Sequence, residues 1–330
     1  MLTSTKELGF LFGISLVWQS SRALLASPPL LLLSRQYASS SFLLAGKYAL
    51  YNDDDNNSSD EPYAVCEERT MDESTTGLST EELKDEVANW YPTMWKEFEF
   101  TSANNGQSFW ARETSFGCGR LGSEIWTAAV ALGLYLVKES SKVTGKQILE
   151  LGAGVGLPSL VCQYELGASN VVATDFWDPE EFFSTGGDAP GRSFGENLYF
   201  NLCQGKIIKP FDQQTMAQRL DWTDLDTVKA ALTSFEGGTP DLVVGSDLVY
   251  YPEIVEPLIS VLKTLMESCS EAILVIALDS KREARDEFLQ RLPEELLNCQ
   301  VESKVYRVEH TYPSQNKENE DFLFLTIAKN

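Results

Sequence analysis

Four short runs of aliphatic, mainly β-branched residues alternate with longer stretches of helical periodicity between residues 147 and 278. The runs cover residues 147–151, 170–174, 241–245 and 272–278. Strands buried on both faces of a parallel sheet form continuous apolar runs of this length, and the intervening stretches are long enough for connecting helices. The pattern therefore predicts βαβ units in an α/β domain with a mostly parallel sheet.

Two further segments extend the predicted sheet. Residues 322–327 are almost entirely apolar and predict a final buried strand close to the C-terminus. Residues 97–100 and 104–110 alternate between polar and apolar positions around an Asn-Gly pair, which is a strong signal for a hairpin turn. The sequence thus places a small β-hairpin before the parallel sheet.

Residues 1–50 differ from the rest of the chain in composition. They are rich in Ser and Leu and contain Lys6, Arg22, Arg35 and Lys47 against one acid, Glu7. Their apolar stretches fall short of the ~20 residues that a membrane-spanning helix needs, so we interpret residues 1–50 as a targeting leader and expect no stable membrane anchoring. A leader with Arg and Ser and few acids is typical of a mitochondrial presequence. A plastid or secretory route and a cytoplasmic protein with a wrongly assigned start codon are the alternatives.

The next segment, residues 51–79, is acidic and has few aliphatic side chains. Such a composition buries too little apolar surface to order the chain, so we expect a disordered linker. Apolar periodicity begins near Thr80 and continues almost to the end. We therefore expect one folded domain over residues 80–330.

The whole chain has 330 residues and a formal net charge of −23. A surface this acidic repels phosphate backbones, so we expect no nucleic-acid partner, and it favours, weakly, a protein partner with a basic surface. The six cysteines include no CxxC pair, and the chain has one histidine, His310. This inventory predicts no metal site.

A glycine-rich segment follows the first of the four apolar runs. Residues 150–156 read Glu-Leu-Gly-Ala-Gly-Val-Gly and lead into a predicted helix, which is the context that a nucleotide-binding loop requires. Asp175 ends the next predicted strand, where a carboxylate can accept hydrogen bonds from both hydroxyls of a ribose. Together, the strand, the loop, the helix and the acid predict a nucleoside-containing cofactor.

The spacing of the glycines bears on which cofactor binds. A dinucleotide-binding loop has the spacing GxGxxG, whereas this loop has GxGxG and Leu157 at the position of the third dinucleotide glycine. Glu150, two residues before Gly152, would repel a pyrophosphate and suits a cationic ligand. These residues favour S-adenosylmethionine over NAD.

The order and spacing of these motifs resemble those of the small seven-strand protein lysine methyltransferases, the methyltransferase 16 family, and in particular its nicotinamide N-methyltransferase-like branch. The matching positions are Trp126, residues 150–156, Thr174-Asp175, Leu220-Asp221-Trp222 and residues 246–251. The resemblance implies a Rossmann-like class I methyltransferase fold, mostly parallel with an antiparallel C-terminal strand. It also implies S-adenosylmethionine as cofactor.

The resemblance also suggests roles for individual residues. It implies that Gly152, Ala153 and Gly154 line the cofactor, that Asp175 binds its ribose and that Trp222 packs beside its adenine. Trp126 and Ser246 would complete the pocket. Glu150, from its charge and its place before Gly152, is a further candidate cofactor-binding residue and suits the cationic methionine moiety. Asp247 and Tyr250 match the family's DxxY motif and are the candidate catalytic residues.

These features predict a monomeric enzyme that transfers a methyl group to a nitrogen of a protein, a lysine side chain or an N-terminal amine. The alternatives are an N-methyltransferase of a small amine or pyridine, and a scaffold that binds the cofactor without turnover. A purely structural role is the alternative for single residues. Asp247 could cap the helix that starts at Pro252, whereas Trp126 and Trp222 could serve only the core.

Overall fold

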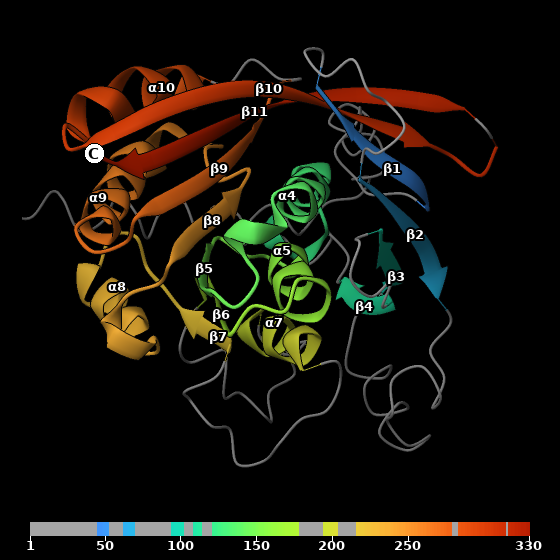
Figure 1. Ribbon diagram of the computed structural model, residues 1–330, viewed down its shortest axis with the longest axis horizontal. Coiled ribbons are helices and arrows are strands. Elements are labelled where there is room, and N and C mark those ends of the chain that lie inside the picture. The colour runs from blue at the N-terminus through green and yellow to red at the C-terminus, as the bar shows by residue number, and fades with distance from the viewer. Residues whose placement is uncertain are drawn as a thin grey trace, which may run out of the picture. The chain divides into compact units, whose positions relative to one another are not determined.

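The backbone is organised around one β-sheet, which has eleven strands within the part of the chain that the structure describes (Figure 1). The computed structural model describes residues 45–52, 62–69, 94–101, 108–113, 121–177, 194–203, 216–278, 283–314 and 316–330. The strands are β1 (Gly46–Tyr51), β2 (Tyr63–Arg69), β3 (Met94–Phe100), β4 (Ser108–Glu113), β5 (Gln147–Leu151), β6 (Asn170–Asp175), β7 (Met216–Arg219), β8 (Leu242–Ser246), β9 (Glu271–Ala277), β10 (Cys299–Thr311) and β11 (Lys317–Lys329). Their order in the sheet is β4-β3-β2-β1-β10-β11-β9-β8-β5-β6-β7.

The strands β5 to β9 form the parallel part of the sheet. Their order, β7-β6-β5-β8-β9, is that of a doubly wound sheet, and each neighbouring pair is parallel. β5, β6, β8 and β9 begin within one residue of the four apolar runs. Buried residues follow one another along these strands, as expected where helices cover both faces. The predicted mostly parallel sheet is confirmed.

The C-terminal strand β11 reverses direction. It lies between β9 and β10 and is antiparallel to both. The predicted antiparallel C-terminal strand is thus confirmed, and its apolar run 322–327 packs in the middle of the sheet, between two neighbouring strands.

Helices cover both faces of the parallel part (Figure 1). The helices are α4 (Thr127–Lys138), α5 (Leu157–Leu160), α7 (Phe194–Leu202), α8 (Leu225–Leu232), α9 (Val255–Met266) and α10 (Glu283–Glu295). α5 continues as a π-helical turn over Val161–Glu165. Buried aliphatic side chains of α4, α5 and α7 contribute to one apolar cluster, and those of α8, α9 and α10 contribute to a second cluster on the other face. The parallel sheet is therefore enclosed between two helical layers.

Four antiparallel strands extend the sheet beyond β10. β3 pairs with β4, which confirms the predicted hairpin, but β3 also pairs with β2, β2 with β1, and β1 with β10. The small hairpin is therefore the outer half of a four-stranded extension. Through the pairing of β1 with β10, the extension is joined to the C-terminal part of the chain.

The extension corrects two predicted boundaries. β1 lies within the predicted leader 1–50, and β2 lies within the predicted disordered linker 51–79, so the folded domain begins well before Thr80. The physical reason is burial: Tyr48 and Leu50 of β1 and Ala64 of β2 are almost fully enclosed, and their backbone groups pair with neighbouring strands. Residues 1–44 and the rest of the linker lie outside the described residues.

Membrane crossing by a helix finds no support among the residues that the structure describes. None of their helices combines the length and the apolar character that a bilayer span needs.

Candidate functional site

The sequence motifs meet at one edge of the sheet. The glycine-rich loop follows β5, Asp175 ends β6, and Ser246 and Asp247 lie at the end of β8, which is the other neighbour of β5. In open α/β sheets, ligands bind outside the carboxyl ends of the strands, at the point where the strand order reverses. That point is at β5, between β6 and β8.

The glycine loop uses backbone conformations that favour glycine. Gly152 and Gly154 both have φ of 58° and Gly156 has φ of 89°. A Cβ atom at Gly152 would lie 2.5 Å from Cδ2 of Leu248, and one at Gly154 would lie 3.1 Å from the carbonyl oxygen of Gly122. The loop is therefore tightly turned and closely packed underneath, and its backbone is left free of side chains at these two positions.

Asp175 is tied directly to this loop. Its Oδ2 accepts a hydrogen bond of 2.7 Å from the Gly154 N–H, and its Oδ1 accepts one of 2.7 Å from the Phe176 N–H. The carboxylate is only partly buried, and a carboxylate oxygen can accept more than one hydrogen bond. Asp175 thus holds the loop and still presents acceptors at the edge of the sheet.

Glu150 lies beneath the loop and is fully buried. Its Oε2 accepts hydrogen bonds from the N–H and the hydroxyl of Ser159, in the first turn of α5, where the helix dipole favours a negative group. Burial raises the pKa of the Glu150 carboxyl to about 8, against the lowering effect of the Ser159 hydrogen bonds. Its Oε1 has no hydrogen-bond partner among the described residues. The structure therefore places Glu150 under the site and not on its surface.

Trp222, Trp126 and Ser246 lie around the same edge. Trp222 is partly buried against the second apolar cluster, and its Cζ2 is 3.6 Å from the position that a Cβ of Gly152 would take. Trp126 immediately precedes α4 and is also partly buried. Ser246 is the last residue of β8. Trp222 is thus adjacent to the glycine loop and packs on the core at the same time.

Asp247 and Tyr250 occupy the turn after β8. Asp247 has φ of 51° and is the non-glycine residue with positive φ among the residues described; its N–H donates to the carbonyl of Val275 at 2.8 Å. The pKa of the Tyr250 phenol is raised to about 12, first by burial and then by the charges of Asp175, Tyr251 and Asp247. Tyr250 therefore lies within electrostatic range of the carboxylates at the ends of two different strands, β6 and β8.

The helix-capping alternative for Asp247 does not describe the turn. Tyr251 is the residue before the 3-10 turn Pro252–Ile254, and α9 begins at Val255. Asp247 lies four positions before Tyr251, so it is not the capping residue. Its left-handed backbone is a strained conformation of the kind that recurs at functional sites.

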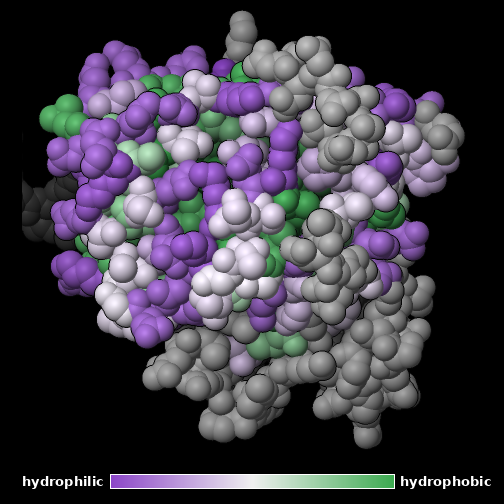
Figure 2. Space-filling model, in the orientation of Figure 1, coloured by the Kyte–Doolittle hydropathy of each residue, from purple (hydrophilic) through white to green (hydrophobic). Residues whose placement is uncertain are grey.

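Tyr250 and Tyr251 form an aromatic rim beside this turn. Their ring centroids are 5.0 Å apart in an edge-to-face arrangement, and the residues are 39% and 54% exposed. The rim therefore opens toward solvent. The described part of the face seen in Figure 2 is mostly hydrophilic, with scattered hydrophobic side chains.

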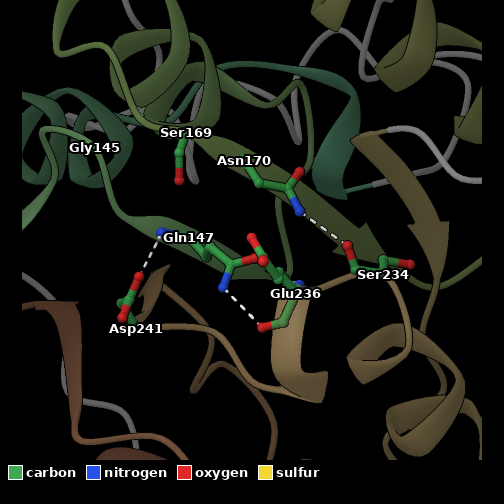
Figure 3. A pocket seen from close by; sticks show the side chains of 7 residues that line it. All are labelled: Gly145, Gln147, Ser169, Asn170, Ser234, Glu236 and Asp241. Carbon is green, nitrogen blue, oxygen red and sulfur yellow. Dashed lines mark hydrogen bonds between the residues drawn. The ribbon is translucent and has the colours of Figure 1, made fainter.

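A hollow of about 440 Å³ lies at the amino ends of the parallel strands, where β5 and β6 begin (Figure 3). Its polar groups bind one another: the Gln147 N–H donates to Asp241, and the Asn170 amide donates to the Ser234 carbonyl (Figure 3). None of the motif residues lines it. The hollow is thus a polar junction of loops and not the candidate site.

Sequence reasoning missed two residues that shape the site. Leu248 fills the space under Gly152, and the backbone of Gly122 packs against Gly154. Leu248 could have been predicted, because it lies between Asp247 and Tyr250 in the DxxY segment. No sequence pattern near Gly122 indicates that it contacts the glycine loop. A metal role gains no support, since no group of three or more His, Cys, Asp or Glu side chains in the described residues is placed to hold an ion.

The sheet order and the glycine loop at its carboxyl edge define the class: this is a Rossmann-like class I methyltransferase fold. The chain belongs to the lysine methyltransferase family, whose model matches residues 104–191 and 196–295.

Relatives with known names are distant. Protein-lysine N-methyltransferase EFM3 of Chaetomium thermophilum is 28% identical over 174 residues, which cover 52% of this chain and 46% of that protein. Protein N-lysine methyltransferase METTL21A of Danio rerio is 28% identical over 196 residues, which cover 59% of this chain and 78% of that protein. The chain thus spans less than half of the length of EFM3. A solved structure, magnesium protoporphyrin IX methyltransferase of Synechocystis with bound SAM, has 15% identity and a TM-score of 0.37 over 62% of this chain and 79% of that one.

S-adenosylmethionine is the cofactor that the family implies, and the residues present fit it. The positive-φ glycines leave the loop backbone open to close approach, and Asp175 offers carboxylate oxygens at the next strand end. The Oε1 atom of Glu150 beneath the loop is buried and has no hydrogen-bond partner among the residues that the structure describes, and a bound ligand or water can satisfy such an atom.

Proposed function

We propose that this protein uses S-adenosylmethionine to methylate a nitrogen of a protein substrate, a lysine side chain or an N-terminal amine. The observation that carries the proposal is the grouping at one sheet edge of the glycine loop, Asp175 and the Asp247–Tyr250 turn. Membership of the lysine methyltransferase family and the names of both relatives support it.

In this proposal the cofactor lies on the glycine loop. Gly152, Ala153 and Gly154 contact it through their backbone, and Asp175 accepts from the ribose hydroxyls. Trp222, Trp126 and Ser246 enclose the adenosine and methionine parts, and Glu150 supports the loop from below. When bound, S-adenosylmethionine would supply an electrophilic methyl group: the bond between sulfur and this methyl carbon breaks as the new N–C bond forms, and the sulfonium becomes a neutral thioether.

The nitrogen that accepts the methyl group must be neutral. A free lysine has a pKa of about 10.4 and is almost fully protonated at pH 7, so the site has to orient the amine and let its proton leave. Asp247 attracts and aligns the incoming ammonium, and the Tyr250 oxygen accepts a hydrogen bond from it. Tyr250 is a neutral phenol at pH 7, since the ordinary pKa of tyrosine is about 10, so it orients the amine and the proton passes to water.

The exposed tyrosine rim and the net charge support a macromolecular substrate. Tyr250 and Tyr251 open to solvent, so a side chain carried on a protein surface can reach the turn. The formal charge of −23 favours a substrate with a basic surface and disfavours nucleic acid. We further propose that the protein acts as a monomer and that it is located in mitochondria. A fluorescent reporter fused to residues 1–50 tests the location. Fluorescence in plastids would favour a plastid protein, and diffuse cytoplasmic fluorescence would favour a cytoplasmic protein.

Methyl transfer to a protein can be measured directly. The full 330-residue chain is incubated with methyl-labelled S-adenosylmethionine and a protein extract, and the products are separated by size. Label on a discrete protein band is the expected result. Label confined to small molecules would support an amine or pyridine methyltransferase, and cofactor binding by calorimetry without any transfer would support a scaffold.

Two variants separate the proposed binding and catalytic roles. Asp175→Ala removes both the ribose acceptor and the bond to Gly154, so cofactor binding should be lost. Asp247→Asn keeps a residue that tolerates the left-handed backbone while removing the charge, so the cofactor should still bind and transfer should fall by on the order of 100-fold. Equal loss of binding in both variants would contradict the role of Asp247.

A further inference from the structure

A buried ion pair joins the two outer strands of the N-terminal extension. Nζ of Lys96 in β3 lies 2.6 Å from Oε2 of Glu113 in β4, and both side chains are at most 2% exposed. Burial raises the pKa of the Glu113 carboxyl, and the charge of Lys96 opposes this. Replacing a buried ion pair with apolar residues is often neutral or stabilising, so the pair is weak evidence of a stabilising role. Its second set of contacts is more informative.

Glu113 also holds the segment that precedes α4. Its Oε1 accepts a hydrogen bond of 2.7 Å from the Ile125 N–H, next to Trp126. The same segment contains Gly122, whose carbonyl oxygen lies 3.1 Å from the position that a Cβ of Gly154 would take. The Glu113 carboxylate is therefore connected to the glycine loop through two contacts. It accepts a hydrogen bond from Ile125, and the segment that contains Ile125 packs on Gly154 through Gly122.

Arg112, the neighbour of Glu113, reaches the other side of the same loop. Its N–H donates to Oδ1 of Asn201 at 3.0 Å, and Nδ2 of Asn201 donates to the carbonyl of Val155 at 3.0 Å. The guanidinium of Arg112 donates to Oδ1 of Asn197 at 2.7 Å, one helical turn earlier in α7. Two consecutive residues of β4 thus connect to Gly154 and to Val155 from different directions.

We propose that Glu113 is a positioning residue for the cofactor site, which holds residues 121–126 against the glycine loop, while Arg112 braces the same loop through Asn201. Glu113 touches neither cofactor nor substrate in this proposal. It acts through Ile125 and its neighbours, so the N-terminal extension supports the cofactor site without lining it. The inference rests on the proposed function, because it concerns the affinity for S-adenosylmethionine.

A pair of charge-free variants isolates the bond to Ile125. Lys96→Met with Glu113→Gln removes both charges and keeps an oxygen acceptor for the Ile125 N–H. Lys96→Met with Glu113→Leu removes the charges and the acceptor. Neither leaves a buried charge without a partner, which would be strongly destabilising in itself.

The full-length wild-type chain and both double variants are compared by calorimetry with S-adenosylmethionine, by thermal unfolding and by initial rates of methyl transfer at varied cofactor concentration. The Gln variant should bind like wild type. The Leu variant should bind roughly tenfold more weakly, with KM for the cofactor raised and kcat at saturation little changed. A purely structural role would lower the melting temperature of the Leu variant without this split between KM and kcat.

A single variant covers the case in which the Leu variant does not fold. Glu113→Asp keeps the charge beside Lys96 and draws the acceptor back by one methylene, so affinity should fall severalfold in a folded protein. Wild-type affinity in Glu113→Asp, or in the folded Leu variant, would overturn the positioning role. Absence of binding in the wild-type chain would instead overturn the proposed function, so the two failures are distinguishable.

Discussion

The parallel part of the sheet and its N-terminal extension are held together differently. β5 to β9 are covered by helices on both faces and packed mainly through aliphatic side chains. The extension β1 to β4 relies on aromatic stacking, such as Phe100 on Phe109 with centroids 5.9 Å apart, and on buried charges such as Lys96 and Glu113. Aliphatic packing tolerates many arrangements of similar volume, whereas a buried ion pair requires one geometry. The extension is thus the more demanding structure to assemble.

The same difference separates the work that the two parts do at the site. The parallel strands supply the residues that line the edge: the glycine loop, Asp175 and Asp247. The extension supplies none of these, and its contacts reach the glycine loop through Glu113 and Arg112. Variants that remove or disturb one part at a time therefore test how far the site depends on each.

Removing β1 and β2 should have the largest effect. A fragment of residues 80–330 loses both strands and exposes the edge of β10 that β1 covers. It also loses the buried side chains of Tyr48 and Leu50, each worth about 1.5–3 kcal/mol, from a total stability of about 5–15 kcal/mol. The fragment should melt at least about 10 °C lower than the full chain, or show no cooperative transition, by circular dichroism.

A chain that starts at residue 42 is the matched control, because it keeps both strands. It should melt within a few degrees of the full-length protein. If the fragment of residues 80–330 melted like this control, the extension would be an appendage and not a part of the domain.

Local signals explain which parts of this fold could be predicted. The glycine loop, Asp175 and the four apolar runs are contiguous patterns whose meaning does not depend on distant residues. β1 is different: its partner β10 is far away in the chain, and its own composition resembles the leader that precedes it. The pairing of β1 with β10 therefore could not be inferred from residues near β1.

Within the site, the positions of motif residues were predictable but their environments were not. Glu150 was assigned from its place before Gly152, yet its burial and its bonds to Ser159 depend on how α5 packs. Glu113 was missed altogether, since an acid in a hairpin strand is normally solvent-exposed and only the fold brings Lys96 and Ile125 to it. Three-dimensional contacts, and not motif content, decide these roles.

Within the parallel part, Gly152→Ala should have an intermediate effect. Alanine at φ of 58° costs about 1–2 kcal/mol, and its Cβ would lie 2.5 Å from the buried Leu248, which adds about 1–3 kcal/mol. Gly145→Ala is the matched control, since Gly145 has φ of 70° and nothing within 4 Å of its added Cβ. Denaturant unfolding should show the larger loss for Gly152→Ala, and cofactor affinity should fall only there. If both variants lost the same free energy of unfolding, backbone strain alone would account for the cost of replacing Gly152, and its close packing against Leu248 would contribute nothing.

The smallest expected effect concerns the junction of β1 and β10, where His310 pairs with Tyr48. His310 is 8% exposed, and the centroid of its ring lies 4.1 Å from the ring centroids of both Tyr48 and Tyr312. Burial lowers the pKa of His310, against the opposing effects of a hydrogen bond with the Ala45 backbone and the charge of Glu318 on β11. Near neutral pH the imidazole is therefore held in its neutral form between aromatic rings.

The sign of the pH dependence follows from this lowered pKa. Between the pKa of folded His310 and its ordinary value of about 6.5, the unfolded chain binds more protons than the folded protein, so the free energy of unfolding falls as the pH is lowered through this window. Glu150, with its raised pKa, contributes a slope of opposite sign between its ordinary pKa and about 8, so the wild-type curve alone cannot isolate the histidine. His310→Phe keeps an aromatic ring in the stack and removes the only histidine of the chain. The difference between wild type and variant, measured by urea unfolding from pH 5 to 8, should change below about pH 6.5 and be constant above it. A difference that is constant over the whole range would show that protonation of His310 is not coupled to the docking of β1.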